Sequence, residues 1–151
     1  MLNIQNLTKT VDFDLISRAM HFALDGKLQQ RTLVNVIEQD RTLDRLSNDD
    51  YELQALLYQS GLAHVYSLII RSGTKRPETI IFHESVHLLQ YESGRLSIDP
   101  VTGWVKWEGA HFDAKTPYRA RPWEKEAFQG QDLLQKAWRN EKKARRKQKG
   151  A

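Results

Sequence analysis

The chain contains no cysteine among its 151 residues. Disulfide bonds and cysteine-ligated zinc sites are therefore excluded, and the cytosol is the natural compartment. No positively charged segment followed by an apolar stretch opens the sequence, so no secretory signal is predicted. The apolar runs are short and interrupted, and we therefore expect neither a membrane span nor a membrane partner.

Apolar residues are nevertheless frequent enough for a folded protein. Hydrophobic residues make up 40% of the chain, and four of the residues are tryptophan. This composition argues against intrinsic disorder, and the length fits one domain with a core of its own.

Positive charge is concentrated at one end. Residues 136–149 hold eight Lys or Arg and one acid, Glu141, so the rest of the chain has 23 − 8 = 15 basic and 19 − 1 = 18 acidic residues. We therefore divide the chain into a single domain, residues 1–135, and a basic tail that is helical or disordered, residues 136–151. The acidic balance of the domain argues against a nucleic-acid-binding surface there.

Helical and strand periodicities alternate along the domain. The predicted helices cover 15–23, capped by Asp12 or Asp14, then 77–91 and 123–146. The predicted strands cover 32–37, 53–59, 63–70, 96–98 and 104–107. Residues 1–10 are expected to be loose or a short edge segment, 38–52 a loop with one helical turn near 43–46, and 108–121 a loop.

The second predicted helix carries an HExxH motif, from His83 to His87. Residues four apart lie on the same face of a helix, so both imidazoles can reach one metal ion. Catalytic Zn²⁺ commonly has three protein ligands and one open position. Glu84 lies about 100° away around the helix axis, where its carboxylate can serve as general base. Pro77 suits the first turn of this helix, and Gly94 suits its end.

The motif leaves the third ligand open. The metzincin extension requires glycine at position 90 and histidine at position 93, and this chain has Gln90 and Ser93, so that class is excluded. The remaining candidates are His64 upstream and Glu108, His111, Asp113, Glu124 and Glu126 downstream.

Two segments together resemble a known family. HESVHLLQY at residues 83–91 and YRARPWEKEAF at residues 118–128 resemble small HExxH proteins of the gluzincin-like zincin class, which occur in phages and bacteria. In those proteins HExxHxxQ is followed by a hairpin and then a P-x-E-x-E-A helix. The resemblance covers residues 77–130, about half of the chain.

The resemblance implies a zincin-like α+β fold, with a small mixed sheet packed on the active-site helix and a second long helix at the C-terminus. It also implies zinc bound by His83, His87 and a glutamate of the second helix, with Glu84 catalytic. We favour Glu126 as that glutamate, because it directly precedes the small residue Ala127. Glu124 is the alternative, about 200° away around the helix.

A three-histidine site completed by His111 is a further alternative, since loops can also supply metal ligands. His64 is expected to be a packed or solvent-facing residue of its strand, and His21 shows no signal of a site.

Other residues are candidates for supporting roles. The carboxylates Glu124 and Asp113 or the amide Gln90 could accept the second ring N–H of a ligating histidine. Tyr118 is our candidate for the donor that stabilises the developing oxyanion, and Arg121 is an alternative.

These features predict a zinc-dependent hydrolase, preferably a peptidase, acting on a peptide or protein in the cytosol of a bacterium or a phage-infected cell. The edge of strand 63–70 is the expected place for an extended peptide to pair. The alternative is a non-catalytic zincin-fold protein that binds metal or a partner. The basic tail is expected to be solvated, and nucleic-acid contact through it is the less favoured possibility.

Overall fold

The computed structural model describes residues 1–48 and 51–150. The predicted loop 38–52 includes residues 49 and 50, and the predicted tail includes residue 151; these three positions lie outside the described residues. Within the described ranges the fold is α+β, as predicted, and it contains two small sheets where one mixed sheet was expected.

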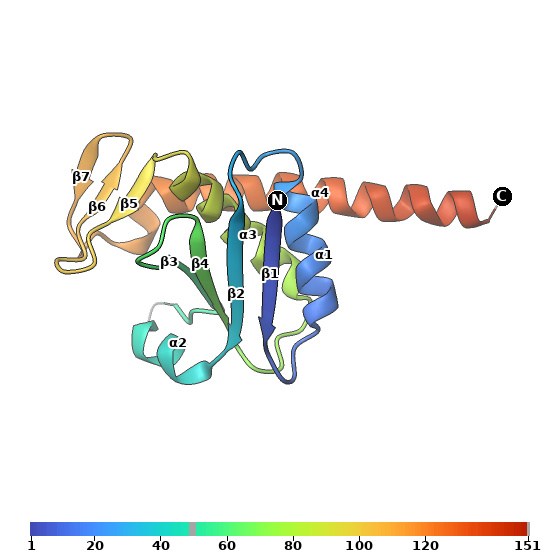
Figure 1. Cartoon of the computed structure of the whole chain (residues 1–151), viewed down its shortest axis with the longest axis horizontal. Helices are drawn as coiled ribbons and strands as arrows, with labels where there is room; N and C mark the ends of the chain where they lie inside the picture. Colours follow the sequence, from blue (N-terminus) through green and yellow to red (C-terminus); the bar gives the residue numbers. More distant parts are fainter. Residues whose placement is uncertain (49–50, 151) are drawn as a thin grey trace.

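The larger sheet has four strands in the order β1-β2-β4-β3. The strands are β1 (Leu2–Leu7), β2 (Thr32–Glu38), β3 (Ala55–Gln59) and β4 (Val65–Ile70). Neighbours β1, β2 and β4 run parallel, and β3 is antiparallel to β4 (Figure 1). The buried strands β2 and β4 are rich in Val, Ile and Leu, as expected of parallel strands in the middle of a sheet.

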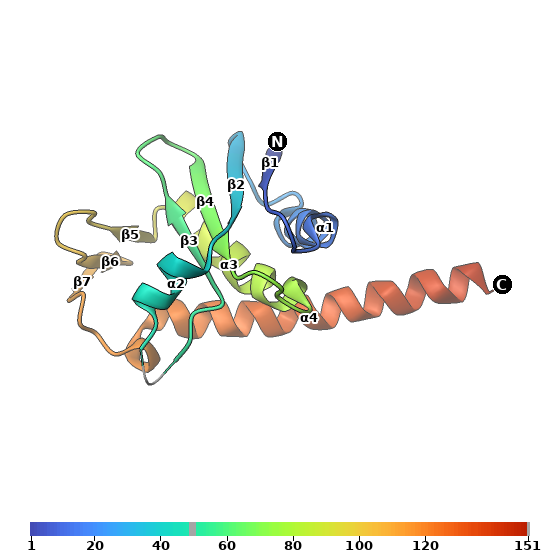
Figure 2. The same cartoon turned by 90° about the horizontal axis from the view of Figure 1, so that it is seen from below.

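Helices cover this sheet in layers. The helices are α1 (Phe13–Leu24), α2 (Asp40–Leu46), α3 (Pro77–Glu92) and α4 (Pro122–Lys149), with a 3₁₀ turn at Tyr118–Ala120. Helices α1 and α3 lie under the sheet, and α4 crosses beneath α3 and continues past it (Figure 2). Fully buried side chains from every layer form one core, including Met20 of α1, Val34 and Leu68 of the sheet, and Phe82 of α3.

The smaller sheet lies at one end of α3 and packs on the start of α4. It contains β5 (Leu96–Ile98), β6 (Val105–Trp107) and β7 (Ala110–Phe112), all antiparallel. Leu96, Val105 and Trp107 form a second core with Trp123 of α4. The hairpin is as predicted, whereas β7 lies within the segment 108–121 that was expected to be a loop.

Local signals define the ends of the motif helix. Pro77 occupies its first turn. At the other end Gly94 has a φ of 74°, and the amides of Gly94 and Arg95 donate to the carbonyls of Tyr91 and Gln90. This is a Schellman motif, which needs a left-handed residue that glycine supplies without strain. Both predicted ends of the helix are therefore confirmed.

Contacts between segments far apart in the sequence decided the strand order, the structure of residues 1–10 and the burial of Trp138. Strand β4 is paired on both sides, so the expectation that its edge binds a peptide is wrong; β1 and β3 are the outer strands. Residues 1–10 supply the edge strand β1, the second of the two expectations for this segment, because the buried strand β2 offers it a complete parallel partner. Trp138 lies within residues 136–151, and it is buried against Phe22 and Phe82, as a packing residue of the long C-terminal helix should be.

Gly130 allows α4 to lie close to α3. A β-carbon built on Gly130 would lie 2.6 Å from Cγ2 of Val86. Alanine normally favours a helix over glycine by about 1 kcal/mol, but overpacking costs about 1–3 kcal/mol. We therefore expect Gly130→Ala to lower the free energy of unfolding by roughly 1 kcal/mol in urea titrations, the difference between these two effects.

Two further variants test this explanation. Adding Val86→Ala to Gly130→Ala should give a favourable coupling energy, because the clashing methyl is removed. Gly61→Ala is the control, since nothing lies within 4 Å of a β-carbon there. A Gly130→Ala chain more stable than the original would contradict a close contact at this point.

Candidate metal centre

Two imidazoles from α3 face one point. His83 Nε2 and His87 Nε2 are 3.2 Å apart, and both side chains are buried. Their separation of four residues places them one turn apart on the same side of the helix, as the motif predicts. Burial of two imidazoles requires polar partners, which α4 supplies.

The third donor is Glu124, in the first turn of α4. Its Oε2 lies 3.0 Å from His83 Nε2 and 3.2 Å from His87 Nε2. His83, His87 and Glu124 form a group that could hold a metal ion. The structure therefore corrects our preference for Glu126 as third ligand in favour of the alternative, Glu124.

The reason for the correction is the rotation of α4. Trp123 and Ala127 are buried, and they fix which side of the helix faces the core. Glu124 and Glu126 flank this buried side in opposite directions. Glu126 therefore reaches Arg95, whose guanidinium nitrogens lie 2.7 and 3.2 Å from its two oxygens, and not the imidazoles.

The three donor atoms are spaced as in a tetrahedral metal site. Zinc bonds imidazole nitrogen and carboxylate oxygen at about 2.0–2.1 Å in tetrahedral sites, so its ligand atoms are about 3.3 Å from one another. The distances of 3.0 to 3.2 Å among the three donors come close to this value. Two imidazoles and one carboxylate are also the ligand set of a well-known type of catalytic zinc.

Without a metal the three groups stabilise one another by charge. Burial opposes ionisation of Glu124, but hydrogen bonds from both imidazoles hold the pKa of its carboxyl well below the usual range. Burial also opposes ionisation of His87 and therefore acts to lower its pKa. The hydrogen bond to Glu124 and the charges of Glu124 and Glu84 outweigh this effect of burial and raise the pKa to about 9. A metal ion would take the place of the shared protons.

A chain of hydrogen bonds orients the ring of His87 through Nδ1, the nitrogen that does not face Glu124. Its Nδ1 lies 2.8 Å from Oε1 of Gln90, and an amide oxygen only accepts, so Nδ1 carries a proton and Nε2 is left for a metal. Gln90 Nε2 donates to the carbonyl of Trp123 and to Glu126 Oε2. Of the three candidates for this supporting role, Gln90 fills it, whereas Glu124 lies at the metal-facing nitrogens and Asp113 accepts from the amide of Lys115. Glu126, which was not a candidate, continues the chain from Gln90.

Glu84 follows His83 on α3, and its carboxyl interacts electrostatically with His87, His83 and Glu124. It is buried, and its Oε2 accepts a hydrogen bond from the backbone amide of Leu57 in β3, at 3.1 Å. Burial raises the pKa of its carboxyl, against the opposing charges of His87 and His83. A raised pKa suits a carboxyl that takes up and returns a proton near neutral pH.

Tyr118 and Arg121, the two candidates for the oxyanion donor, lie just before the start of α4. The hydroxyl of Tyr118 donates to Glu124 Oε2 at 2.8 Å. Burial and the charge of Glu124 raise the pKa of this hydroxyl, so it remains a donor. The guanidinium of Arg121 lies 5.6 Å from the ring centre of Tyr118 and holds the carbonyl of Thr116 through Nε.

One cleft of about 620 Å³ is lined by His83, Glu84, His87, Tyr118, Arg121 and Glu124, whereas Gln90 and Glu126 are not among its lining residues. Residues of β3, α3, the β5–β6 hairpin and the start of α4 line the cleft. Most of the other lining side chains are apolar and include Leu57, Ile80, Leu96, Ile98, Val105 and Phe128. Leu57 and Phe128 carried no signal of a site in the sequence, because each is an ordinary apolar residue of its element.

The other predicted candidates are not part of the group formed by His83, His87 and Glu124. His111 is an exposed residue of β7, and Glu108 pairs with Arg95. Asp113 lines the cleft, but its carboxylate accepts from the amide of Lys115. His64 is bonded to Glu92, which also accepts from Tyr66 and Thr32. None of these joins His83 and His87 in the group that the described residues form.

The chain matches no protein-family model, no curated protein and no solved structure. Among the described residues, no helix combines the length and the apolar character needed to cross a membrane.

Proposed function

We propose that this protein is a zinc-dependent hydrolase that cleaves peptide bonds. The observation that carries the proposal is the convergence of His83 Nε2, His87 Nε2 and Glu124 Oε2 at the floor of a cleft that also contains Glu84. A structural metal site is commonly closed by four protein ligands, whereas three ligands beside a cleft leave room for a reactant.

Zinc held by these three side chains would supply a Lewis acid that polarises the scissile carbonyl and activates water. Glu84 accepts the proton of the attacking water and later delivers it to the leaving amine. Its bond to the Leu57 amide keeps the carboxylate pointed into the cleft. Tyr118 is the candidate donor to the oxyanion, because its hydroxyl already reaches the ligand carboxylate at 2.8 Å.

Strand β3 supplies the edge on which we place an extended substrate. It is an outer strand of the sheet, and the Leu57 amide shows that its free edge faces Glu84. A peptide added alongside β3 would therefore pass next to the general base. The apolar walls at Leu96, Val105 and Phe128 favour substrates with bulky apolar side chains beside the cleaved bond.

The test begins with metal content. The full chain, produced in zinc-containing medium, should contain about one zinc per protein by mass spectrometry of the metal. It should cleave members of a quenched-fluorescent peptide library, preferring Leu or Phe over Asp or Lys next to the cut. Chelation should abolish cleavage, and added zinc should restore it.

The metal site and the hydrolase activity are contradicted by different results. A chain without zinc would contradict the metal site itself. A chain with stoichiometric zinc that cleaves no peptide and no unfolded protein would contradict the hydrolase and leave a metal-binding protein.

A further inference from the structure

The last part of α4 extends beyond the body of the molecule. Trp138 is the last buried residue of this helix, and after it every residue to Gly150 is exposed except the partly buried Glu141. Figures 1 and 2 show this segment projecting from the layered domain with no other element beside it. We call residues 139–149 the projecting helix.

The basic side chains of the projecting helix repel one another. The helix has seven Lys or Arg and one acid, Glu141, which pairs with Arg145. In four pairs of basic residues the two members are four positions apart, so that they lie on adjacent turns of the same face. These pairs are 139 with 143, 142 with 146, 143 with 147, and 145 with 149. Such pairs destabilise a helix, although basic residues near its C-terminus interact favourably with the dipole.

The amino-acid composition of the projecting helix limits the classes of partner that it can bind. Ala144 is the only apolar side chain in the projecting helix. A coiled-coil seam needs two large apolar residues in each heptad, and a helix that lies in a membrane surface needs a broad apolar face. The segment has neither, and its surplus of positive charge complements a regular array of negative charges, as in a phosphate backbone.

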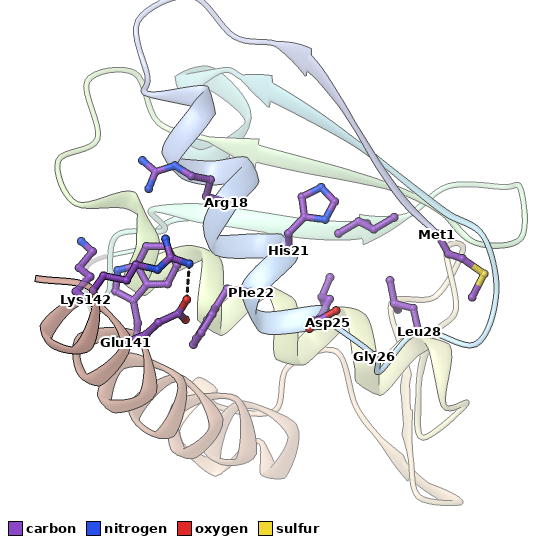
Figure 3. A pocket seen from close by; sticks show the side chains of 13 residues that line it. Met1, Arg18, His21, Phe22, Asp25, Gly26, Leu28, Glu141 and Lys142 are labelled. Atoms are coloured by element: carbon purple, nitrogen blue, oxygen red, sulfur yellow. Dashed lines mark hydrogen bonds and ion pairs between the residues drawn. The ribbon is translucent and has the colours of Figure 1, made fainter. Parts of the chain in front are cut away.

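Charged side chains of both signs lie where the projecting helix meets the body of the molecule. A hollow of about 830 Å³ lies between α1 and α4. Figure 3 shows Arg18 and His21 entering it from α1, and Glu141 and Lys142 from α4. Arg145 also lines it, and the carboxylate of Glu141 is already engaged by that guanidinium. Asp25 also lines the hollow, and Arg18 pairs with Asp14 at 3.0 Å, so the positive charge that reaches the hollow comes from Lys142 and from the basic members of these two ion pairs.

We propose that the projecting helix and the adjoining hollow bind the phosphate backbone of a nucleic acid. Phosphates would neutralise the like-charge pairs, so binding and helix stability increase together. The segment spans roughly 16 Å, and one face can contact about three or four phosphates. Binding is therefore independent of base sequence and sensitive to salt. It uses none of the residues of the metal centre.

The probe is a fluorescein-labelled 24-base-pair duplex DNA, measured by fluorescence anisotropy with the full chain. Three or four released counterions predict an affinity roughly 40- to 150-fold weaker in 200 mM than in 50 mM salt. Far-UV circular dichroism should show increased helix content when unlabelled duplex is added.

A charge-neutral variant gives the main comparison. It replaces six residues by glutamine, a good helix former: Lys142, Lys143, Arg145, Arg146, Lys147 and Lys149. The matched control replaces six exposed basic residues of the body by glutamine: Lys9, Arg31, Arg41, Lys75, Lys106 and Lys115. We expect the first variant to lose at least tenfold in affinity at 50 mM salt, and the control to keep its affinity within about threefold.

Truncation offers a second variant that preserves the core. A stop after Asn140 removes six basic residues but keeps Trp138, whereas a stop after Gln135 would remove this buried side chain. No binding of the full chain at 50 mM salt would overturn the proposal. Equal loss in the two six-residue variants would overturn it as well, as would binding to vesicles with 30% phosphatidylserine but not to duplex DNA.

Discussion

Glu124→Gln will weaken zinc binding by more than about 100-fold, whereas Glu126→Gln will weaken it by roughly tenfold. The first change replaces the carboxylate whose Oε2 lies within 3.2 Å of both imidazoles. The second affects only Gln90 and Arg95, behind the ligands. Replacing a residue that supports a ligand typically costs 10- to 100-fold in metal affinity, and loss of a ligand costs more.

The two variants are matched controls for each other. They introduce the same substitution on the same helix, two residues apart, and remove the same charge. Zinc affinity is measured by competition with a fluorescent chelator, and circular dichroism confirms that both chains are folded. The reverse order of affinities would show that Glu126 is the ligand and that α4 is rotated differently about its axis.

If the proposed hydrolase is correct, we expect Glu84→Gln to lower kcat/KM for peptide cleavage by about 10²- to 10⁴-fold and to leave zinc binding intact. General acid–base catalysis by one positioned side chain contributes about 10²- to 10⁴-fold to the rate, and an amide cannot accept the proton. The fold should survive, because the amide oxygen can still accept the hydrogen bond from Leu57. The change also removes a buried carboxyl whose pKa is raised by burial, and with it the cost of ionising that group.

The readouts are kcat/KM on the best library peptide and the zinc content of the same preparation. Glu52→Gln is the control, since Glu52 lines the same cleft but its side chain is 67% exposed. It should retain activity within a few-fold. Cleavage by zinc-loaded Glu84→Gln at the original rate would exclude Glu84 as general base.

Glu126 has a role that its position in the sequence did not reveal. It bonds Gln90, which orients His87, and it is itself held by Arg95, which follows Gly94 at the end of the motif helix. The guanidinium of Arg95 also pairs with Glu108 and lies 4.7 Å from the ring centre of Trp107. The small sheet is thereby connected to the metal centre through side chains.

The sequence by itself determined the features that depend on neighbouring residues along the chain. His83 and His87 share a face because helices repeat every 3.6 residues. Pro77 and Gly94 delimit that helix because of their own backbone preferences. Asp12 was one of two candidate caps for α1, and its side chain accepts from the amide of Leu15.

Only the tertiary structure decided which residues from distant segments meet these histidines. The choice between Glu124 and Glu126 depends on the rotation of α4, which is set by burial of Trp123 and Ala127 and by the close contact at Gly130. The edge at the cleft belongs to β3 and not to β4, because β4 is paired on both sides. Packing against other elements fixes rotation and strand order, and no pattern within a single segment contains that information.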